Sequence, residues 1–372
     1  MATSTPCWKR SPPPTGPSSS RSDDRCWRTS QTLWCPRRRT APCGDVRSAA
    51  KSAWAFAGAP VTRDPAVPAD PAVPADPAAS AAAAPVPLRQ VLAEAERALA
   101  EGGVASPRFD AESLAAHVLG VSRGRLLLRP LVDRSDVDTL RALVARRAGR
   151  EPLQHLLGTA VLGPVEVAVG PGVFTPRPET ELLLEWGLRA LTGIASPLIV
   201  DLCTGSGALA LAFADARRDA VVHAVEADPG ALVWARRNIA ERGDRVVLHA
   251  ADVREPDLLA GLARRVDLLV CNPPYVPDET PVPPEVGLWD PAIAVFGGPD
   301  GLEIIRAVVG RAAVLLRPGG ALAIEHDDTH AEAVPALLRA TPELDDVAEH
   351  ADLNNRPRYA TATKGESGVR PR

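Results

Sequence analysis

The stretch Val266–Thr280 joins an apolar, strand-like run to residues that could hold a planar amide. The run VDLLVC ends in Asn272, Pro273, Pro274 and Tyr275. Asn272 offers a carbonyl acceptor and an amino donor, whereas the prolines lack an N–H group and stiffen the loop. The loop carbonyls are then free to face inward, and Tyr275 supplies a ring face. We interpret this as a site that aims a planar nitrogen at an electrophile; the alternative is a proline-rich turn that only ends a strand.

A second motif, DLCTGSGALAL, begins at the end of another apolar run. Asp201 closes that run, and Gly205 and Gly207 bracket a turn that opens a helical pattern. Glycine lets the backbone approach a ligand closely and adopt a positive φ. The motif has neither the G-x-G-x-x-G spacing nor the Lys-Ser/Thr of a phosphate loop. Alone it is weak evidence, because a turn that only packs a helix on a sheet has the same composition.

Acidic residues end the next two apolar runs. Glu226, in AVEAD, lies about 20 residues after the glycines, where a carboxylate can accept both hydroxyls of a ribose. Asp228 competes for that role, although its place before Pro229 also suits a helix N-cap. Asp252, in HAADV, is placed to meet an adenine amino group. Taken in order, the glycine-rich and the two acidic strand ends predict a nucleoside site.

The elements that must position these motifs alternate along the chain from Pro178. Helical spacing is found in the runs 179–191, 207–218, 230–243 and 301–316. Strand-like runs are 197–203, 220–228, 245–252, 266–272 and 319–326. This alternation predicts an α/β fold with a mostly parallel sheet and helices on both faces. Ligands bind at the carboxyl ends of the strands of such sheets.

A small helical domain is predicted upstream, at residues 87–150. Its first helix has the apolar spacing Val91, Leu92, Ala95 and Leu99. A second helix follows Ser106-Pro107 and stops at Gly120, and a third has Ser135 or Asp136 as its N-cap. Residues 151–178 contain GTAVLGPVEVAVGPGVF, which predicts a β-hairpin or two short strands.

Taken together, the motifs resemble those of Class I S-adenosylmethionine-dependent methyltransferases, which have a Rossmann-like fold. The stretches SPRFDAESLAAHVLG, EPLQHLLG, VFTPRPETELLLEWGL and DPAIAVFGGPDGLEIIR make the chain similar to one family in particular. This is the PrmC/HemK family of peptide chain release factor glutamine N5-methyltransferases, and the resemblance covers roughly residues 87–364. The family often has Gly where Cys203 stands, Glu-Pro where Asp290-Pro291 stand, and a bulky aromatic where Val253 stands. The last difference implies a less tightly packed adenine pocket.

The resemblance implies S-adenosylmethionine as cofactor and, as substrate, the glutamine of the Gly-Gly-Gln loop of release factors, whose methylation modulates translation termination. The implied cofactor-binding residues are Asp201, Cys203, Thr204, Gly205, Ser206, Gly207, Glu226, Asp252, Val253 and Asn272. The implied substrate-binding residues are Asn272, Pro273, Pro274 and Tyr275, with Arg177 and Glu179 of TPRPETE as further candidates. Asn272, Pro273 and Tyr275 are the expected catalytic residues, and no metal is implied.

Methyl transfer to an amide needs alignment and desolvation more than a strong base, so His155, His249 and His326 are expected to be structural. Two other functions stay open. A DNA or RNA adenine-N6 methyltransferase would use the same Asn-Pro-Pro-Tyr chemistry. A non-enzymatic cofactor-binding scaffold would require a degraded pocket, which the intact Gly205, Glu226 and Asn272 contradict.

Charge argues against a nucleic-acid substrate. The net charge is −4, but residues 1–54 hold ten Lys/Arg and three Asp/Glu, which leaves 32 basic and 43 acidic residues afterwards. With a net charge of −11, residues 55–372 lack the excess of basic residues that is typical of a nucleic-acid-binding protein. No apolar run reaches the ~20 residues that cross a bilayer. We therefore expect a cytoplasmic protein with release factors as partners, no direct nucleic-acid binding and no membrane association.

Residues 1–86 are predicted to be a disordered Pro/Ala/Ser/Arg-rich extension that adds nothing to catalysis. They contain SPPPTGPSSS and a short tandem repeat, DPAVPADPAVPADP, neither of which could bury a face. Four cysteines without a C-x-x-C pair favour neither a zinc site nor a disulfide framework. The extension could be a transit peptide, a linker or translated upstream sequence, with Val86 as a candidate start. The methyltransferase domain is predicted at 179–364 and a disordered tail at 365–372.

Overall fold

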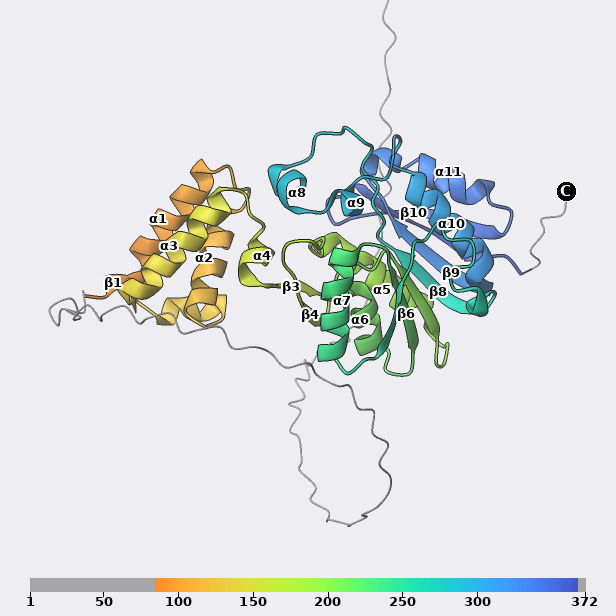
Figure 1. The fold of residues 1–372 in the computed structure, drawn as a ribbon, viewed down its shortest axis with the longest axis horizontal. Coiled ribbons are helices and arrows are strands. Elements are labelled where there is room, and N and C mark those ends of the chain that lie inside the picture. The colour runs from red at the N-terminus through yellow and green to blue at the C-terminus, as the bar shows by residue number, and fades with distance from the viewer. Residues whose placement is uncertain (1–83, 367–372) are drawn as a thin grey trace, which may run out of the picture. The chain divides into compact units, whose positions relative to one another are not determined.

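The computed structural model describes residues 84–366. The predicted extension at 1–86 and the predicted tail at 365–372 therefore lie almost wholly outside the described residues. Within this range a helical segment precedes an α/β segment (Figure 1). The longest described helix has 15 residues, and no helix between residues 84 and 366 has the length and apolar character needed to span a bilayer.

Three α-helices build the helical segment, as the sequence predicts. They are α1 (Leu88–Glu101), α2 (Pro107–Val118) and α3 (Arg134–Ala148). Between α2 and α3 lie η1 (Arg123–Leu128) and β2 (Leu131–Val132), and β2 pairs antiparallel with β1 (Val86–Pro87). Helix α1 buries Val91, Ala95 and Leu99 on one face, against Leu114 of α2 and Leu140 of α3. The predicted amphipathic spacing is confirmed, although Leu92 is only half-buried.

The predicted N-cap of the third helix is wrong. Asp133 is the last residue with extended backbone, at φ −74° and ψ 153°, and helix α3 starts directly after it. Ser135 and Asp136 therefore lie inside the first turn. Asp136 is still favourable there, because a carboxylate near a helix N-terminus interacts well with the helix dipole.

A short helix and a hairpin connect the two segments. Helix α4 (Leu153–Leu157) leads into β3 (Thr159–Leu162) and β4 (Val165–Ala168), which pair antiparallel. The turn between them contains Gly163 at φ 54°, a left-handed conformation that glycine adopts without a steric penalty. The predicted hairpin is thus confirmed. It precedes η2 (Pro178–Thr180) and α5 (Glu181–Ala190).

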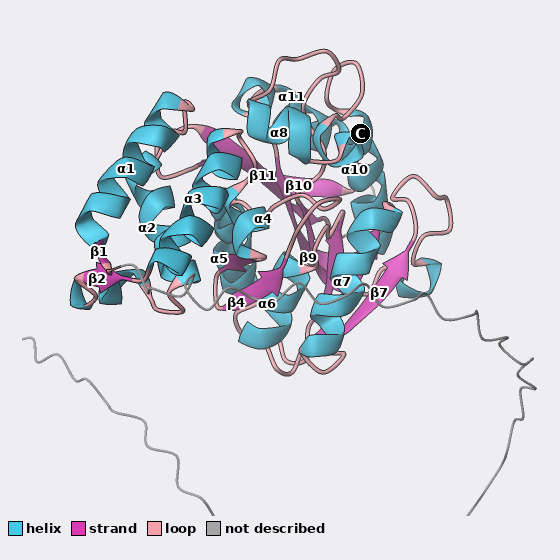
Figure 2. Ribbon diagram, turned by 60° about the vertical axis from the view of Figure 1, so that its left-hand side comes forward, coloured by secondary structure: helices cyan, strands magenta, loops and turns pink. Residues whose placement is uncertain are grey.

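The α/β segment is built on a seven-stranded sheet of order β10-β11-β9-β8-β5-β6-β7. Figure 2 shows its strands in magenta, with helices packed around them. Five of its strands are parallel: β5 (Leu198–Leu202), β6 (Val221–Glu226), β7 (Val246–Ala250), β8 (Val266–Cys271) and β9 (Leu316–Glu325). The antiparallel strands β10 (Leu344–Ala351) and β11 (Pro357–Lys364) complete it. The predicted mostly parallel sheet is confirmed, whereas the C-terminal antiparallel pair was not predicted.

Alternate residues of each strand pack against helices on opposite faces. In β8, Leu268 and Val270 belong to one buried cluster and Leu269 and Cys271 to the other. The first cluster includes residues of α5, α6 (Ala208–Ala216) and α7 (Pro229–Glu241), and the second those of α10 (Glu303–Leu315) and α11 (Ala333–Ala340). Each fully buried Leu, Ile or Val contributes about 1.5–3 kcal/mol to folding. The layers hold the strand ends rigidly at one edge of the sheet.

The loops at this edge carry most of the remaining short elements. Helices α8 (Pro284–Trp289) and α9 (Ala292–Val295) follow β8, and η4 (Asp328–His330) follows β9. The turn η3 (Ala260–Leu262) lies at the opposite edge, shortly before β8 begins. Because β5, β6, β7 and β8 run parallel, the loops that leave their carboxyl ends lie close to one another. The predicted site residues are concentrated in these loops.

Candidate active site

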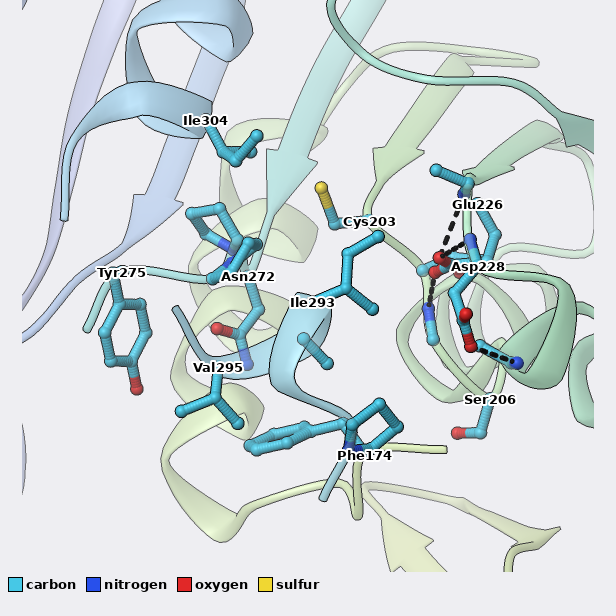
Figure 3. A pocket seen from close by; sticks show the side chains of 18 of the residues that line it. Phe174, Cys203, Ser206, Glu226, Asp228, Asn272, Tyr275, Ile293, Val295 and Ile304 are labelled. Carbon is cyan, nitrogen blue, oxygen red and sulfur yellow. Dashed lines mark hydrogen bonds between the residues drawn. The ribbon is translucent and has the colours of Figure 1, made fainter. Parts of the chain in front are cut away.

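A cavity of about 430 Å³ opens at the carboxyl ends of the parallel strands, a size that is typical of small-molecule sites. It brings together most of the predicted site residues: Arg177, Asp201, Cys203, Thr204, Gly205, Ser206, Glu226, Asp252, Val253, Asn272, Pro273, Pro274 and Tyr275. Gly207 and Glu179 do not line it. Figure 3 shows Glu226 and Asn272 at opposite ends, with Cys203 and Ile293 between them.

The glycine-rich turn after β5 is held by Asp201. The buried Asp201 carboxylate accepts hydrogen bonds from Thr204 Oγ1 at 2.5 Å and from the Ala210 N–H at 3.1 Å. Burial raises the pKa of Asp201 to about 7, although both hydrogen bonds oppose the rise. Gly205 and Gly207 have φ values of 58° and 83°, so the turn uses the freedom that the sequence predicts for them. Gly207 acts as the N-cap of α6 rather than as cavity lining.

Cys203 also has a positive φ, of 58°. A non-glycine residue in this region costs about 1–2 kcal/mol. The turn therefore keeps a conformation better suited to glycine, and the Cys203 side chain is directed toward the cavity it lines (Figure 3).

The Glu226 carboxylate ties the end of β6 to the glycine-rich turn. It accepts hydrogen bonds from the N–H groups of Gly205 at 2.7 Å, Ala227 at 2.9 Å and Asp228 at 2.8 Å (Figure 3). Burial raises the pKa of Glu226, and the three backbone donors oppose that rise. Asp228 accepts from the Ala231 N–H at 2.8 Å, so its alternative role as N-cap of α7 is confirmed.

Replacing Glu226 with glutamine is expected to weaken S-adenosylmethionine binding about 10-fold, because a hydrogen bond to a charged acceptor is worth roughly 1.5–3 kcal/mol. Alanine is a poorer test, since it leaves all three backbone N–H groups without their acceptor, whereas glutamine can keep the acceptor of two of them. Titration calorimetry of the parent, Glu226→Gln and the exposed control Glu241→Gln measures the effect. Equal affinities in all three proteins would remove Glu226 from cofactor binding.

Asp252 and Val253 lie at the cavity wall beyond β7. The Asp252 carboxylate forms an ion pair with Arg254 at 2.7 Å, and this contact lowers its pKa. Arg254 also pairs with Glu303 at 2.8 Å. Val253 is buried. Arg254 therefore links this loop to the start of α10, and the role of both residues at an adenine stays a prediction.

The Asn-Pro-Pro-Tyr loop is held from two sides. Asn272 Nδ2 donates to Thr180 Oγ1 at 3.1 Å, and Tyr275 OH donates to Glu325 Oε1 at 3.4 Å. Burial and the nearby Glu325 charge raise the pKa of Tyr275, so the phenol stays neutral. Neither Thr180 nor Glu325 was predicted as a site residue. Thr180 lies within the TPRPETE motif and Glu325 ends a predicted strand, but nothing in the sequence joins them to Asn272.

The FGGPDG turn supports the same loop from behind. Val276 N donates to Val295 O at 3.0 Å, and Gly297 N donates to Val276 O at 2.8 Å. A Cβ at Gly297 would lie 2.5 Å from the Pro274 carbonyl oxygen, and one at Gly301 would overlap that of Tyr275. These glycines are therefore required for the loop carbonyls to keep their positions.

Arg177 and Glu179 take different places. Arg177 lines the cavity, pairs with the buried Asp290 carboxylate at 2.9 Å and lies over the Phe174 ring at 4.9 Å. It thereby joins the TPRPETE segment to the residue that directly follows α8. Glu179 stays outside the cavity wall. His155, His249 and His326 do not line the cavity either.

The sequence reasoning missed the apolar part of the cavity wall. Phe174, Ile293, Val295 and Ile304 are the labelled examples in Figure 3. They come from three separate segments: the stretch before η2, helix α9 and helix α10. No single local pattern therefore marks them. Their apolar surfaces line the same cavity as Glu226 at its carboxylate end and Asn272 at its amide end.

Comparisons with known proteins match both segments. The family model "PrmC N-terminal domain" matches residues 90–158, and the model "Methyltransferase small domain" matches residues 165–282. The release factor glutamine methyltransferase of Mycolicibacterium smegmatis is 52% identical over 280 residues, which are 74% of this chain and 98% of that protein. The release factor glutamine methyltransferase of Mycobacterium tuberculosis is 48% identical over 293 residues, 76% of this chain and 95% of that protein.

Among solved structures, the E. cuniculi Mtq2–Trm112 complex, described as responsible for methylation of the eRF1 translation termination factor, is similar to this chain with a TM-score of 0.36. Its sequence identity is 22%, over 52% of this chain and 99% of that chain.

Proposed function

Because the chain belongs to the release factor glutamine methyltransferase family, we propose that it methylates the side-chain amide nitrogen of a glutamine in peptide chain release factors. The methyl donor is S-adenosylmethionine, and the acceptor is the glutamine of the Gly-Gly-Gln loop. This reaction modifies the loop that acts in translation termination. We also propose that the enzyme works in the cytoplasm, where its substrate acts.

The cavity fits S-adenosylmethionine at its carboxylate end. Its volume of about 430 Å³ suits a ligand of this size. The turn with Gly205 and Gly207 allows close approach. Glu226 Oε1 accepts from two backbone N–H groups and Oε2 from one, so Oε2 keeps a lone pair to accept a ribose hydroxyl. Asp201, Cys203, Thr204 and Ser206 would surround the methionine part, and Asp252 and Val253 the adenine.

The observation that carries the proposal is that one cavity joins this carboxylate end to the Asn-Pro-Pro-Tyr loop. The bound cofactor supplies a methyl group already activated by a positively charged sulfur. The protein must then align an amide nitrogen that is a poor nucleophile, because its lone pair is conjugated with the carbonyl. Alignment and desolvation can contribute about 7–11 kcal/mol to such a reaction.

Asn272 and the Pro273 carbonyl would accept the two N–H groups of the glutamine amide, so its lone pair faces the methyl group. Pro273 and Pro274 carry no N–H that would compete for these acceptors. The Tyr275 ring and Pro274 would bound the acceptor pocket, and Arg177 would close it from the opposite side through Asp290. The nitrogen–carbon bond forms as the carbon–sulfur bond breaks, and the amide proton leaves to water.

The helical segment is the proposed second contact with the release factor. The end of α3 and the residues just after it are joined to α8, which lines the cavity through Val286. Arg147 Nη2, in α3, lies 3.1 Å and Arg150 Nη2 lies 2.5 Å from the Glu285 carboxylate. Deleting residues 87–150 would therefore disturb the cavity wall as well as substrate capture. Surface substitutions in the helical segment are the better test of its role.

Radiolabelled methyl transfer should be measured side by side on a release factor, on its Gly-Gly-Ala loop variant and on duplex DNA. We expect the release factor to be labelled and both other acceptors to stay at background. Labelling of the loop variant as strongly as of the parent would overturn the glutamine assignment, and preferential labelling of DNA would replace this function with adenine methylation.

A further inference from the structure

Glu325 is a buried carboxylate that the chemistry described so far does not use. It ends β9, and only 1% of its surface is exposed. Its Oε2 accepts a hydrogen bond from Thr180 Oγ1 at 2.9 Å, and its Oε1 accepts from Tyr275 OH at 3.4 Å. A buried ionisable group is costly unless it is paired or hydrogen-bonded, so its presence beside the acceptor end requires a reason.

The reason lies in a second hydrogen bond, which Thr180 makes with Asn272. Thr180 Oγ1 also contacts Asn272 Nδ2, at 3.1 Å. A hydroxyl has a single proton. When Thr180 gives that proton to the Glu325 carboxylate, it can present only lone pairs to Asn272. The Asn272 amide must then turn its NH₂ group toward Thr180.

The other atom of that amide, Oδ1, accepts no hydrogen bond from residues 84–366, and Asn272 lines the cavity. The Glu325–Thr180 bond therefore decides which atom of Asn272 is offered to a substrate. An oxygen accepts an N–H of the glutamine amide, whereas an NH₂ group in its place would repel it.

We propose that Glu325 is a positioning residue that acts through Thr180 to hold the Asn272 amide with Oδ1 toward the acceptor nitrogen. Its second oxygen steadies the Tyr275 phenol at the other end of the same loop. The inference rests on the proposed function, because it assigns a role in presenting an N–H acceptor to the substrate.

The direction of these hydrogen bonds depends on the charge of Glu325. As a neutral acid, Glu325 can donate to Thr180, whose own proton is then free to point at Asn272 and to favour the reversed amide. Burial raises the pKa of Glu325 to about 7; the Thr180 bond, Arg358 of β11 and Tyr275 oppose the rise, and Glu179 of η2 adds to it. The correct orientation is thus favoured above pH 7 and lost below it.

Thr180→Val and Thr180→Ser form a matched pair for the test, because valine keeps the shape of threonine and serine keeps its hydroxyl. We expect kcat to fall about 100-fold in Thr180→Val, as for other small misplacements of reacting groups, with an unchanged Kd for S-adenosylmethionine. Thr180→Ser should stay within about threefold of the parent, since it preserves the hydroxyl that orients Asn272. Equal kcat values in the two variants, at equal melting temperatures, would overturn the proposal.

Glu325→Gln provides an independent readout, the pH profile of kcat between pH 6 and 8.5. In the parent, kcat should rise through pH 7. In Glu325→Gln the amide oxygen can still accept from Thr180 but does not titrate, so the profile should lack the Glu325 step. Asp201, with a pKa also about 7, remains in the variant and could cause a step of its own in the pH profile. Such a step is distinguishable because the titration of Asp201 would also change the affinity for the cofactor. A Glu325→Gln enzyme with the parent's rate and profile would overturn the proposal.

Each variant is compared with the parent on whichever acceptor the parent methylates, release factor or duplex DNA. If the glutamine assignment is wrong, the parent methylates an acceptor other than the release factor loop. If the positioning role is wrong, the kcat values of the variants equal that of the parent on the same acceptor.

Discussion

Asn272→Ala is expected to lower kcat for release factor methylation by about 100- to 1,000-fold, the range found when one preorganised hydrogen-bonding group is removed from a reacting centre. The substitution removes the Oδ1 acceptor, and it also removes the Nδ2 donor that ties the loop to Thr180. The Kd for S-adenosylmethionine should change only a few-fold, because the carboxylate end of the cavity is untouched.

The matched control is Asn354→Ala, at an exposed position in the turn between β10 and β11. Single-turnover kinetics with saturating cofactor, together with calorimetry, separate the chemical step from binding. An Asn272→Ala enzyme that keeps the parent's kcat would show that the loop serves structure rather than chemistry.

Gly301→Ala is expected to destabilise the protein by about 2–5 kcal/mol and to abolish most of the activity. A Cβ there would overlap the Tyr275 carbonyl oxygen and lie 2.8 Å from His330 Cε1, at a φ of 70°. Overpacking costs about 1–3 kcal/mol, and a left-handed non-glycine residue adds about 1–2 kcal/mol. The Asn-Pro-Pro-Tyr loop would have to move away from its partners.

Gly319→Ala isolates the backbone part of this effect. Gly319 has nearly the same φ, 71°, but its Cβ would meet only Arg317 Nη1 at 3.5 Å. We expect a loss of about 1 kcal/mol there, with full activity. Thermal melts and methylation assays of both variants provide the comparison, and equal losses would rule out the steric support of the loop.

The sequence predicted the parts of the site that are local in the chain. Asp201, Glu226 and Asn272 each end an apolar run, and parallel strands necessarily bring such ends to one edge. Asp228 was left open between ribose binding and helix capping because its two roles have the same local signature; the structure assigns the cap through the Ala231 N–H.

What the sequence could not predict depends on contacts between distant segments. The Glu325–Thr180 bond joins residues 145 positions apart, and the Asn272–Thr180 bond residues 92 apart. The pairing of Arg147 and Arg150 with Glu285 is of the same kind. The antiparallel strands β10 and β11 were missed because β10 is polar and only partly buried along most of its length, so it lacks the apolar run that marks the parallel strands.

The two buried carboxyls of the site also couple folding to proton uptake. Asp201 and Glu325 have pKa values of about 7 in the folded chain, against ordinary values near 4 in the unfolded chain. Between about pH 4 and pH 7 the folded protein therefore binds more protons than the unfolded chain. Its free energy of unfolding falls as the pH rises, and by pH 7 each group has lowered it by an amount on the order of 3 kcal/mol. Glu325 therefore becomes charged, and orients Asn272, only at a pH at which the folded protein is less stable than it is in mild acid.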